Sequence, residues 1–133
     1  MSNLAAFFEQ ANWPAAEVEP DVWHCAFTGP SGAAYHLYVL AADDWLHFAV
    51  SPLLHAAELA QIENAGSGPL PPALLRANQA LRLARLALDD DGDINLLADL
   101  PAAHTNAAFF TETLELLAGY ADELASPLRQ ASS

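Results

Sequence analysis

Lysine is absent from this sequence, and its basic side chains are limited to four arginines against 17 aspartate and glutamate residues, which gives a formal net charge of -13. Nucleic acid is not an expected partner, because binding it requires clustered lysine and arginine to displace counterions from the phosphates. An anionic membrane surface would repel the chain for the same reason. The acidity instead favours solubility and rapid encounter with basic partners.

Cysteine is nearly absent as well: Cys25 is the only one, so no intramolecular disulfide can form. The first residues have neither the positive charge of a signal peptide nor a long apolar run, so no leader or transmembrane segment is expected and a cytoplasmic location is the default. Hydrophobic residues make up 53% of the 133 residues, which is ample for one core. We expect a single α+β domain over residues 1–126 and a frayed tail over residues 127–133, after Pro127 ends the last helix.

Residues 21–51 alternate with a period of two in three short runs separated by tight links, which predicts an antiparallel meander of three strands. Pro52 is expected to end the third strand. One face of these strands is plainly apolar, and the opposite face is mixed. The apolar face consists of Trp23, Cys25, Phe27, Leu37, Val39, Leu46, Phe48 and Val50.

The remaining segments alternate between helical patterns and one hairpin. Apolar residues at helical spacing predict helices over residues 3–13, 71–80 and about 105–125, with a looser helix over residues 53–64. The Asp91-Gly92 step predicts a hairpin turn between strands of residues 83–89 and 93–99. Residues 65–69 are expected to form a flexible break, because they contain two glycines and a proline. The predicted order is helix, three-stranded antiparallel meander, helix, β-hairpin and helix, with the helices packed on one face of the sheet.

This order is the layout of the type III secretion chaperone-like fold. The second half of the chain resembles two families with that fold, through residues 74–78, 84–93, 98–101 and 120–124, including Asn78 and Leu100-Pro101. One family is the secretion chaperones of the Tir-chaperone type, and the other is the YbjN-type family of sensory-transduction regulators. The segment from Trp45 to Pro52 is more similar to the YbjN type. The resemblance implies no catalytic residue; it implies a homodimer and binding to an extended segment of a client protein.

Three histidines are the most tempting chemical feature. His24, His36 and His47 fall on three successive predicted strands, on the face opposite the apolar one. If the register brings His47 opposite Tyr38 and His24 across from His36, three imidazoles could hold a zinc ion. The alternative is three polar residues on a partly solvated face, because a one-residue slip in register would scatter the set. A small metal-binding protein or enzyme is therefore the alternative function, although no cofactor is expected.

The acidic run from Asp89 to Asp93 looks at first like a calcium-binding loop. Aligning Gly92 with the glycine of an EF-hand loop, however, puts Ala87 and Ala98 at positions that must supply oxygen ligands. An acidic hairpin turn is the better interpretation.

Nucleophilic and acid–base catalysis find little support. Cys25 alternates with aromatic residues on the apolar face, which indicates a small buried thiol and not a reactive one. The carboxylate pairs Asp43-Asp44 and Glu17-Glu19 lie in turns or flanks, where nothing places them across a cleft. We therefore expect a non-enzymatic protein.

Aromatic residues beside the histidines suit a protein interface. Either a partner protein or the chain's own residues 53–69 would cover this face. The expected function is a protein-binding module, chaperone-like or a regulatory adaptor, that binds a client segment as a homodimer. The residues expected at the interface are Tyr38, Leu40 and Trp45 on the strands, with Phe109 and Leu116 beside the apolar stripe of the last helix.

Overall fold

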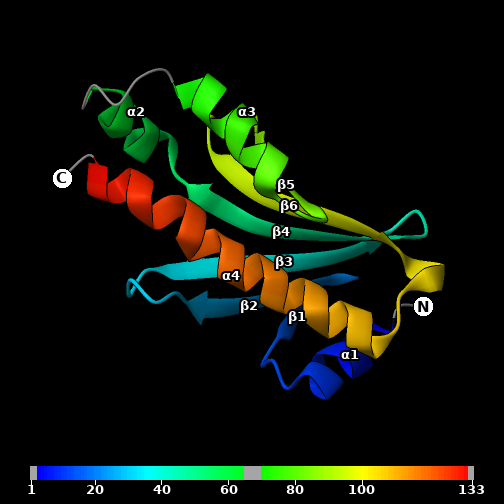
Figure 1. The fold of residues 1–133 in the computed structure, drawn as a ribbon. Coiled ribbons are helices and arrows are strands. Elements are labelled where there is room, and N and C mark those ends of the chain that lie inside the picture. Colours follow the sequence, from blue (N-terminus) through cyan, green and yellow to red (C-terminus); the bar gives the residue numbers. More distant parts are fainter. Residues whose placement is uncertain (1–2, 65–69, 132–133) are drawn as a thin grey trace.

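The computed structural model describes residues 3–64 and 70–131, and within them the fold is α+β (Figure 1). All neighbouring strands pair antiparallel in a six-stranded sheet of order β1-β2-β3-β4-β6-β5. The strands are β1 (Ala16–Glu19), β2 (Val22–Thr28), β3 (Ala34–Ala42), β4 (Trp45–Leu54), β5 (Ala84–Leu88) and β6 (Ile94–Pro101). The helices are α1 (Leu4–Ala11), α2 (Ala56–Asn64), α3 (Leu70–Ala80), the short 3-10 helix η1 (Ala102–His104) and α4 (Ala107–Ala131). The predicted meander, hairpin and flanking helices are confirmed.

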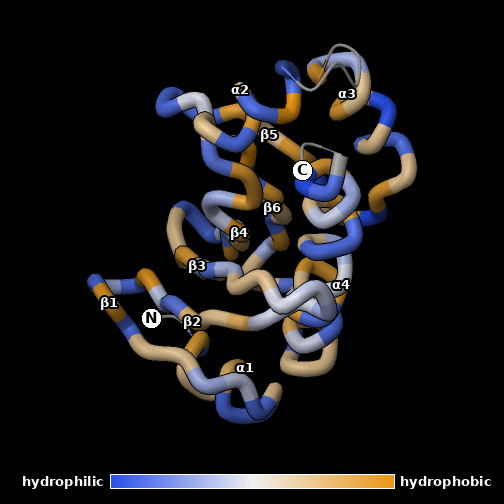
Figure 2. Tube along the Cα trace, turned by 90° about the vertical axis from the view of Figure 1, so that its left-hand side faces the viewer, coloured by the Kyte–Doolittle hydropathy of each residue, from blue (hydrophilic) through white to orange (hydrophobic). Residues whose placement is uncertain are grey.

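The helices gather on one side of the sheet. The long helix α4 crosses the strands diagonally with α1 beside its first turns, and α3 lies next to β5 (Figures 1 and 2). The helix α2 packs against α3 and α4 at one end of the sheet. Within the described residues, no helix has the length and apolar character needed to cross a membrane.

The core lies between this helical layer and the inner face of the sheet. Burial alternates strictly along β6, as a period of two requires for a strand covered on one face. The predicted apolar face is confirmed, because its members are either buried or packed against the core. Phe110 of α4 joins the layers: its ring centroid lies 5.4 Å from that of Phe48 on β4 and 5.0 Å from that of Phe8 on α1.

Two features of the sheet differ from the sequence prediction. The strand β1 lies at the edge and all four of its residues are exposed, so it carries none of the alternation that reveals a half-buried strand. The strand β4 continues past Pro52 to Leu54, through an irregularity in its register with β6. A proline fits such an interruption because it supplies no N–H to the ladder. The predicted flexible break at residues 65–69 lies outside the described residues.

The last helix is also longer than predicted. It was expected to end near Ala125, with Pro127 stopping it and residues 127–133 frayed, but α4 runs to Ala131 with Pro127 inside it. The reason lies in tertiary contacts that the local pattern does not reveal. Nε of Arg129 donates to Glu58 Oε2 at 2.7 Å, and the other guanidinium nitrogens donate to the Tyr35 hydroxyl and the Leu53 carbonyl at 2.9 Å each.

A second anchor ties α4 to the β2–β3 turn. The Asp122 carboxylate, only 5% exposed, accepts hydrogen bonds from the Ser31 backbone N–H at 2.8 Å, the Ser31 hydroxyl at 2.6 Å and the Tyr35 hydroxyl at 2.8 Å. The approach is so close that a Cβ added to Gly29 would lie 2.5 Å from Asp122 Cγ. Glycine at position 29 is therefore the residue that lets this buried carboxylate reach the turn.

Candidate protein-binding face

The side of the sheet turned away from the helices is open. In Figure 2 the strands β1 to β4 lie to the left of α3 and α4, and no helix of residues 3–64 or 70–131 lies over the side of the sheet turned away from α4. Opposite residues in the register share a face, which fixes its membership. We call this surface of strands β2 to β6 the outer face; it consists of Val22, His24, Ala26, Thr28, Ala34, His36, Tyr38, Leu40, Ala42, Trp45, His47, Ala49, Arg85, Ala87, Asn95, Leu97, Asp99 and Pro101.

Large apolar side chains stand exposed on the outer face, at the end of the sheet beside the β3–β4 turn. Leu40 on β3 is 37% exposed and Trp45 on β4 is 44% exposed. They are diagonal neighbours, because Leu40 pairs with His47 and Ala42 pairs with Trp45. The half-buried Tyr38 lies two residues before Leu40 on the same strand. The structure therefore brings Tyr38, Leu40 and Trp45 onto one surface.

The other two expected interface residues lie elsewhere. Phe109 and Leu116 belong to α4, on the helical side of the sheet, where both are half-buried and Phe109 packs against the core. The chain's own segment also does not cover the outer face in the described part, because residues 56–64 form α2 and pack against α3 and α4.

The three histidines lie on the outer face but do not converge. Nε2 of His24 and Nδ1 of His36 lie 2.9 Å apart, and their rings stack with centroids 5.1 Å apart. His47 pairs with Leu40, not with Tyr38 as the sequence suggested, so the expected register was wrong. Nδ1 of His47 instead lies 2.6 Å from Asp99 Oδ1 on β6. The result is a histidine pair and a separate histidine–aspartate contact.

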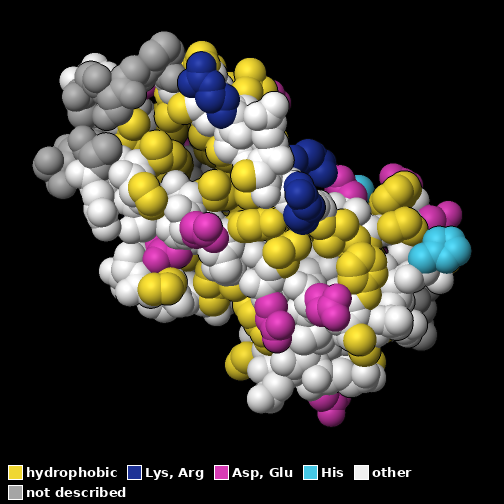
Figure 3. Space-filling view, in the orientation of Figure 1, with side chains coloured by type: hydrophobic (Ala, Val, Ile, Leu, Met, Phe, Trp, Pro, Cys, Tyr) yellow, Lys and Arg dark blue, Asp and Glu magenta, His cyan; other side chains and the backbone are white. Residues whose placement is uncertain are grey.

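Charge on the outer face is sparse and paired. Asp99 is the one carboxylate among the outer-face residues defined above. Its second oxygen, Oδ2, forms an ion pair with Nη2 of Arg85 at 2.8 Å. Desolvation would raise the pKa of Asp99, but the hydrogen bonds from His47 and Arg85 outweigh it and hold that pKa below its usual value. Asp99 therefore stays ionised, and Arg85 balances its negative charge. By contrast, Figure 3 shows acidic side chains spread over the helical side of the molecule.

The margins of the outer face are acidic. Glu19 on the edge strand β1 pairs with Val22, and Asp43 and Asp44 form the turn between β3 and β4. All three side chains are exposed. The outer face is thus an apolar and aromatic surface with carboxylates at its border.

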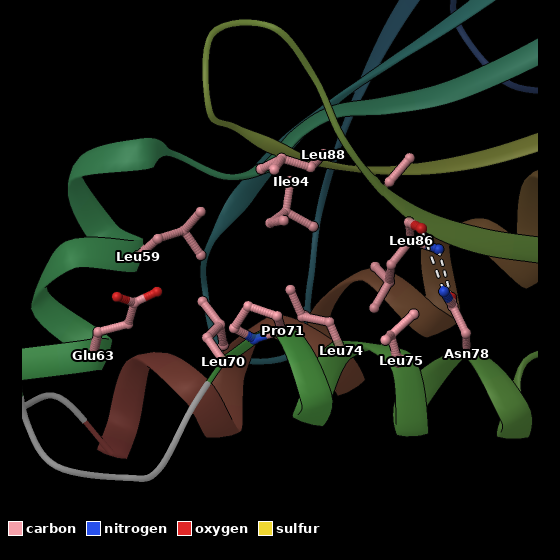
Figure 4. A pocket seen from close by; sticks show the side chains of 11 residues that line it. Leu59, Glu63, Leu70, Pro71, Leu74, Leu75, Asn78, Leu86, Leu88 and Ile94 are labelled. Atoms are coloured by element: carbon pink, nitrogen blue, oxygen red, sulfur yellow. Dashed lines mark hydrogen bonds between the residues drawn. The ribbon is translucent and has the colours of Figure 1, made fainter.

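A second apolar surface lies between α2, α3 and the β5–β6 hairpin (Figure 4), and sequence reasoning did not predict it. This hollow measures about 320 Å³ and is walled by leucines and Ile94. Leu75 and Leu88, each 69% exposed, stand at its margin. The Asn78 side chain closes the outward edge of β5 beside it, since its Oδ1 accepts from the Leu86 N–H at 2.7 Å. The two exposed leucines are the signal that could have revealed it.

The remaining candidates have structural roles. Cys25 is 3% exposed, and burial raises the pKa of its thiol to about 11, so the thiolate is scarce at neutral pH. The carboxylate oxygens of Asp89, Asp91 and Asp93 lie within 4.8 Å of one another. Asp89 Oδ1, however, accepts the backbone N–H groups of Asp91 and Asp93, as the acidic hairpin interpretation predicts.

The fold and this surface define a class: an α+β protein whose antiparallel sheet is covered by helices on one side and presents a free, aromatic face on the other. No family model matches the chain, and no curated protein matches it. Among solved structures, it is similar to a chain in the crystal structure of the ExsC-ExsE complex. The two share 18% sequence identity with a TM-score of 0.46, over 92% of this chain and 90% of that chain.

Proposed function

We propose that this protein is a non-enzymatic protein-binding module that forms a homodimer through the outer face. The observation that carries the proposal is the pair of exposed side chains Leu40 and Trp45, which are neighbours on the uncovered face of the sheet near the β3–β4 turn. Burying apolar surface stabilises an association by roughly 25 cal/mol per Å² before its costs. Tryptophan is among the residues that contribute most to such interfaces.

The charge distribution favours a second copy as the occupant of the outer face. Two chains that each carry a net charge of -13 repel each other at long range. The outer-face residues include one carboxylate, Asp99, which is already compensated by Arg85 and His47. Contact through the acidic helical side would bring like charges together and cost free energy.

The resemblance of the sequence to secretion chaperones and to YbjN-type regulators supports the role of the dimer. We propose a chaperone-like or regulatory adaptor that binds a segment of a client protein. The hollow beside α3, with Leu75 and Leu88 at its margin, offers an apolar surface that stays open when the outer face is occupied. Glu63 lines this hollow, so a client segment with apolar side chains flanked by basic ones would fit it.

Analytical ultracentrifugation over a range of concentrations tests the dimer. We expect the wild-type chain to form a dimer. Trp45→Ser should weaken dimerisation by at least about tenfold, because it removes an aromatic side chain that dimerisation would bury. Leu88→Ser is the matched control, since Leu88 is more exposed than Trp45 but lies off the outer face. A wild-type chain that stays monomeric at all concentrations, or equal weakening by Leu88→Ser, would contradict the proposal.

A further inference from the structure

We infer that His24 and His36 form a binding site for a divalent transition-metal ion of the Cu(II), Ni(II) and Zn(II) class. The inference does not rest on the proposed function. Nε2 of His24 and Nδ1 of His36 lie 2.9 Å apart on the surface of the sheet. Neutral imidazole nitrogens are ligands that suit these ions.

The separation of the two nitrogens matches a chelate. Metal–nitrogen bonds to histidine measure about 2.0–2.1 Å, so two ligands at a right angle have nitrogens about 2.9 Å apart. Two ligands at a tetrahedral angle lie farther apart, at about 3.3 Å. The observed 2.9 Å therefore fits adjacent positions of a square-planar or octahedral ion, which favours Cu(II) and Ni(II).

The register of β2 and β3 builds this pair. His24 is directly opposite Tyr38, so His36, two residues earlier on β3, is its diagonal neighbour. Diagonal positions across antiparallel strands are within reach of long side chains. The Tyr38 ring lies 5.0 Å from the His24 ring and restricts it on one side. The two imidazoles are thus brought together by the sheet itself.

The surroundings leave room for an ion and its remaining ligands. The residues paired across the strands from the two histidines include Ala16 opposite His24 and Ala26 opposite His36, and both alanines are small. His36 and Ala26 are exposed. An ion held by two imidazoles would complete its coordination with water from this side.

The competing explanation is a hydrogen bond between two neutral imidazoles, in which one ring nitrogen donates and the other accepts. A metal ion requires both nitrogens to offer a lone pair, so the ion would replace that hydrogen bond with two coordinate bonds. His47 does not add a third ligand to the pair, because the register places it opposite Leu40 on β4, where its Nδ1 lies 2.6 Å from Asp99 Oδ1. The two explanations therefore differ in one measurable property, which is metal affinity.

The test uses the untagged full chain, stripped with a chelator and titrated with Cu(II) while electron paramagnetic resonance is recorded. We expect one tightly held ion per chain, or one per two chains, with hyperfine coupling to imidazole nitrogen. His24→Gln and His36→Gln should each weaken Cu(II) binding by roughly tenfold or more, since removing even an outer partner of a metal ligand costs that much. His104→Gln is the control, because His104 is exposed on η1 and remote in sequence from the pair.

Circular dichroism of each variant establishes that it is folded, and the exposed position of the pair makes that the expected result. Wild-type affinity for Cu(II) equal to that of the double variant His24→Gln/His36→Gln would overturn the inference and leave only the imidazole hydrogen bond. Bound Cu(II) without nitrogen coupling would also overturn it, since that signature belongs to carboxylates such as those of the β5–β6 turn. Sedimentation in excess chelator separates this outcome from the dimer proposal, which needs no metal.

Discussion

The two faces of the sheet are made by the same strands, yet polar and apolar side chains are placed differently on them. On the inner face, apolar side chains fill the space, and the single carboxylate that enters from α4, Asp122, is held by three hydrogen bonds from Ser31 and Tyr35. On the outer face, His24 lies against His36, Asp99 lies against His47 and Arg85, and large apolar side chains remain in water. The chain's own helices cover the inner face, whereas no helix of the described residues covers the outer face.

This difference indicates what each face is for. A buried carboxylate is tolerated only where hydrogen bonds replace those of water, and on the inner face the chain itself supplies these hydrogen bonds. An exposed Trp45 next to Leu40 has no such compensation within the chain. Substitutions on the two faces should therefore separate stability from association.

The largest effect is expected for Phe110→Ala on the inner side. Phe110 is fully buried and its ring contacts those of Phe7, Phe8 and Phe48, with centroids 5.2, 5.0 and 5.4 Å away. Its truncation should lower the free energy of unfolding by about 3–5 kcal/mol, measured by urea denaturation. Trp45→Ala on the outer face should change it by less than about 1 kcal/mol in the monomer. Similar losses in the two variants would show that the outer face is part of the core.

Elements with a strong periodic pattern could be predicted from the sequence. The meander of residues 21–51 and the Asp91-Gly92 hairpin carry their own local signals, and the structure confirms both. The edge strand β1 could not be predicted, because all four of its residues are exposed and nothing alternates. The last turns of α4 could not be predicted either, because Arg129 is anchored by Glu58 and Leu53, 71 and 76 residues earlier.

The sequence was enough to predict which residues lie on the candidate surface, but not the strand register that decides which of them touch. Alternation was enough to assign Tyr38, Leu40 and Trp45 to the face opposite the core. Which outer-face residues touch depends on the length of each turn, and the two-residue turn at Asp43-Asp44 places His47 opposite Leu40 and away from the other histidines. The partnership of His47 with Asp99 spans 52 residues and needs the β4–β6 pairing, which no local pattern encodes.

An intermediate effect is expected for Asp122→Asn, which keeps the shape of the side chain but removes its charge. Losing charge-assisted hydrogen bonds at a buried site should cost about 1–3 kcal/mol at neutral pH. The Ser31 hydroxyl bond is the main cause that lowers the pKa of Asp122 from its ordinary value of 3.8. Because the folded-state pKa is the lower one, the stabilisation is present above pH 3.8 and is lost as the pH falls below it.

Urea denaturation of the wild type and Asp122→Asn at several pH values measures this loss. The difference between the two should be full at neutral pH and shrink below pH 3.8. Glu115→Gln is the matched control, since Glu115 is an exposed acid on the same helix and its substitution changes the net charge equally. A pH-independent difference for Asp122→Asn would mean that packing against Gly29, and not the charge, is what the site contributes.

The smallest effect is expected for Arg85→Gln on the outer face. The Arg85 side chain is half exposed, and its ion pair with Asp99 lies in a partly solvated setting. Such pairs contribute about 0.2–1 kcal/mol, and salt screens them, so the loss should shrink between low and high ionic strength. Arg129→Gln is the comparison across the sheet, because Arg129 also pairs with a carboxylate but is less exposed and bonds Tyr35 and Leu53 as well. If Arg85→Gln lowered the free energy of unfolding as much as Arg129→Gln at high salt, the outer face would contribute to the stability of the fold. Its role as a free binding surface would then lose its main support.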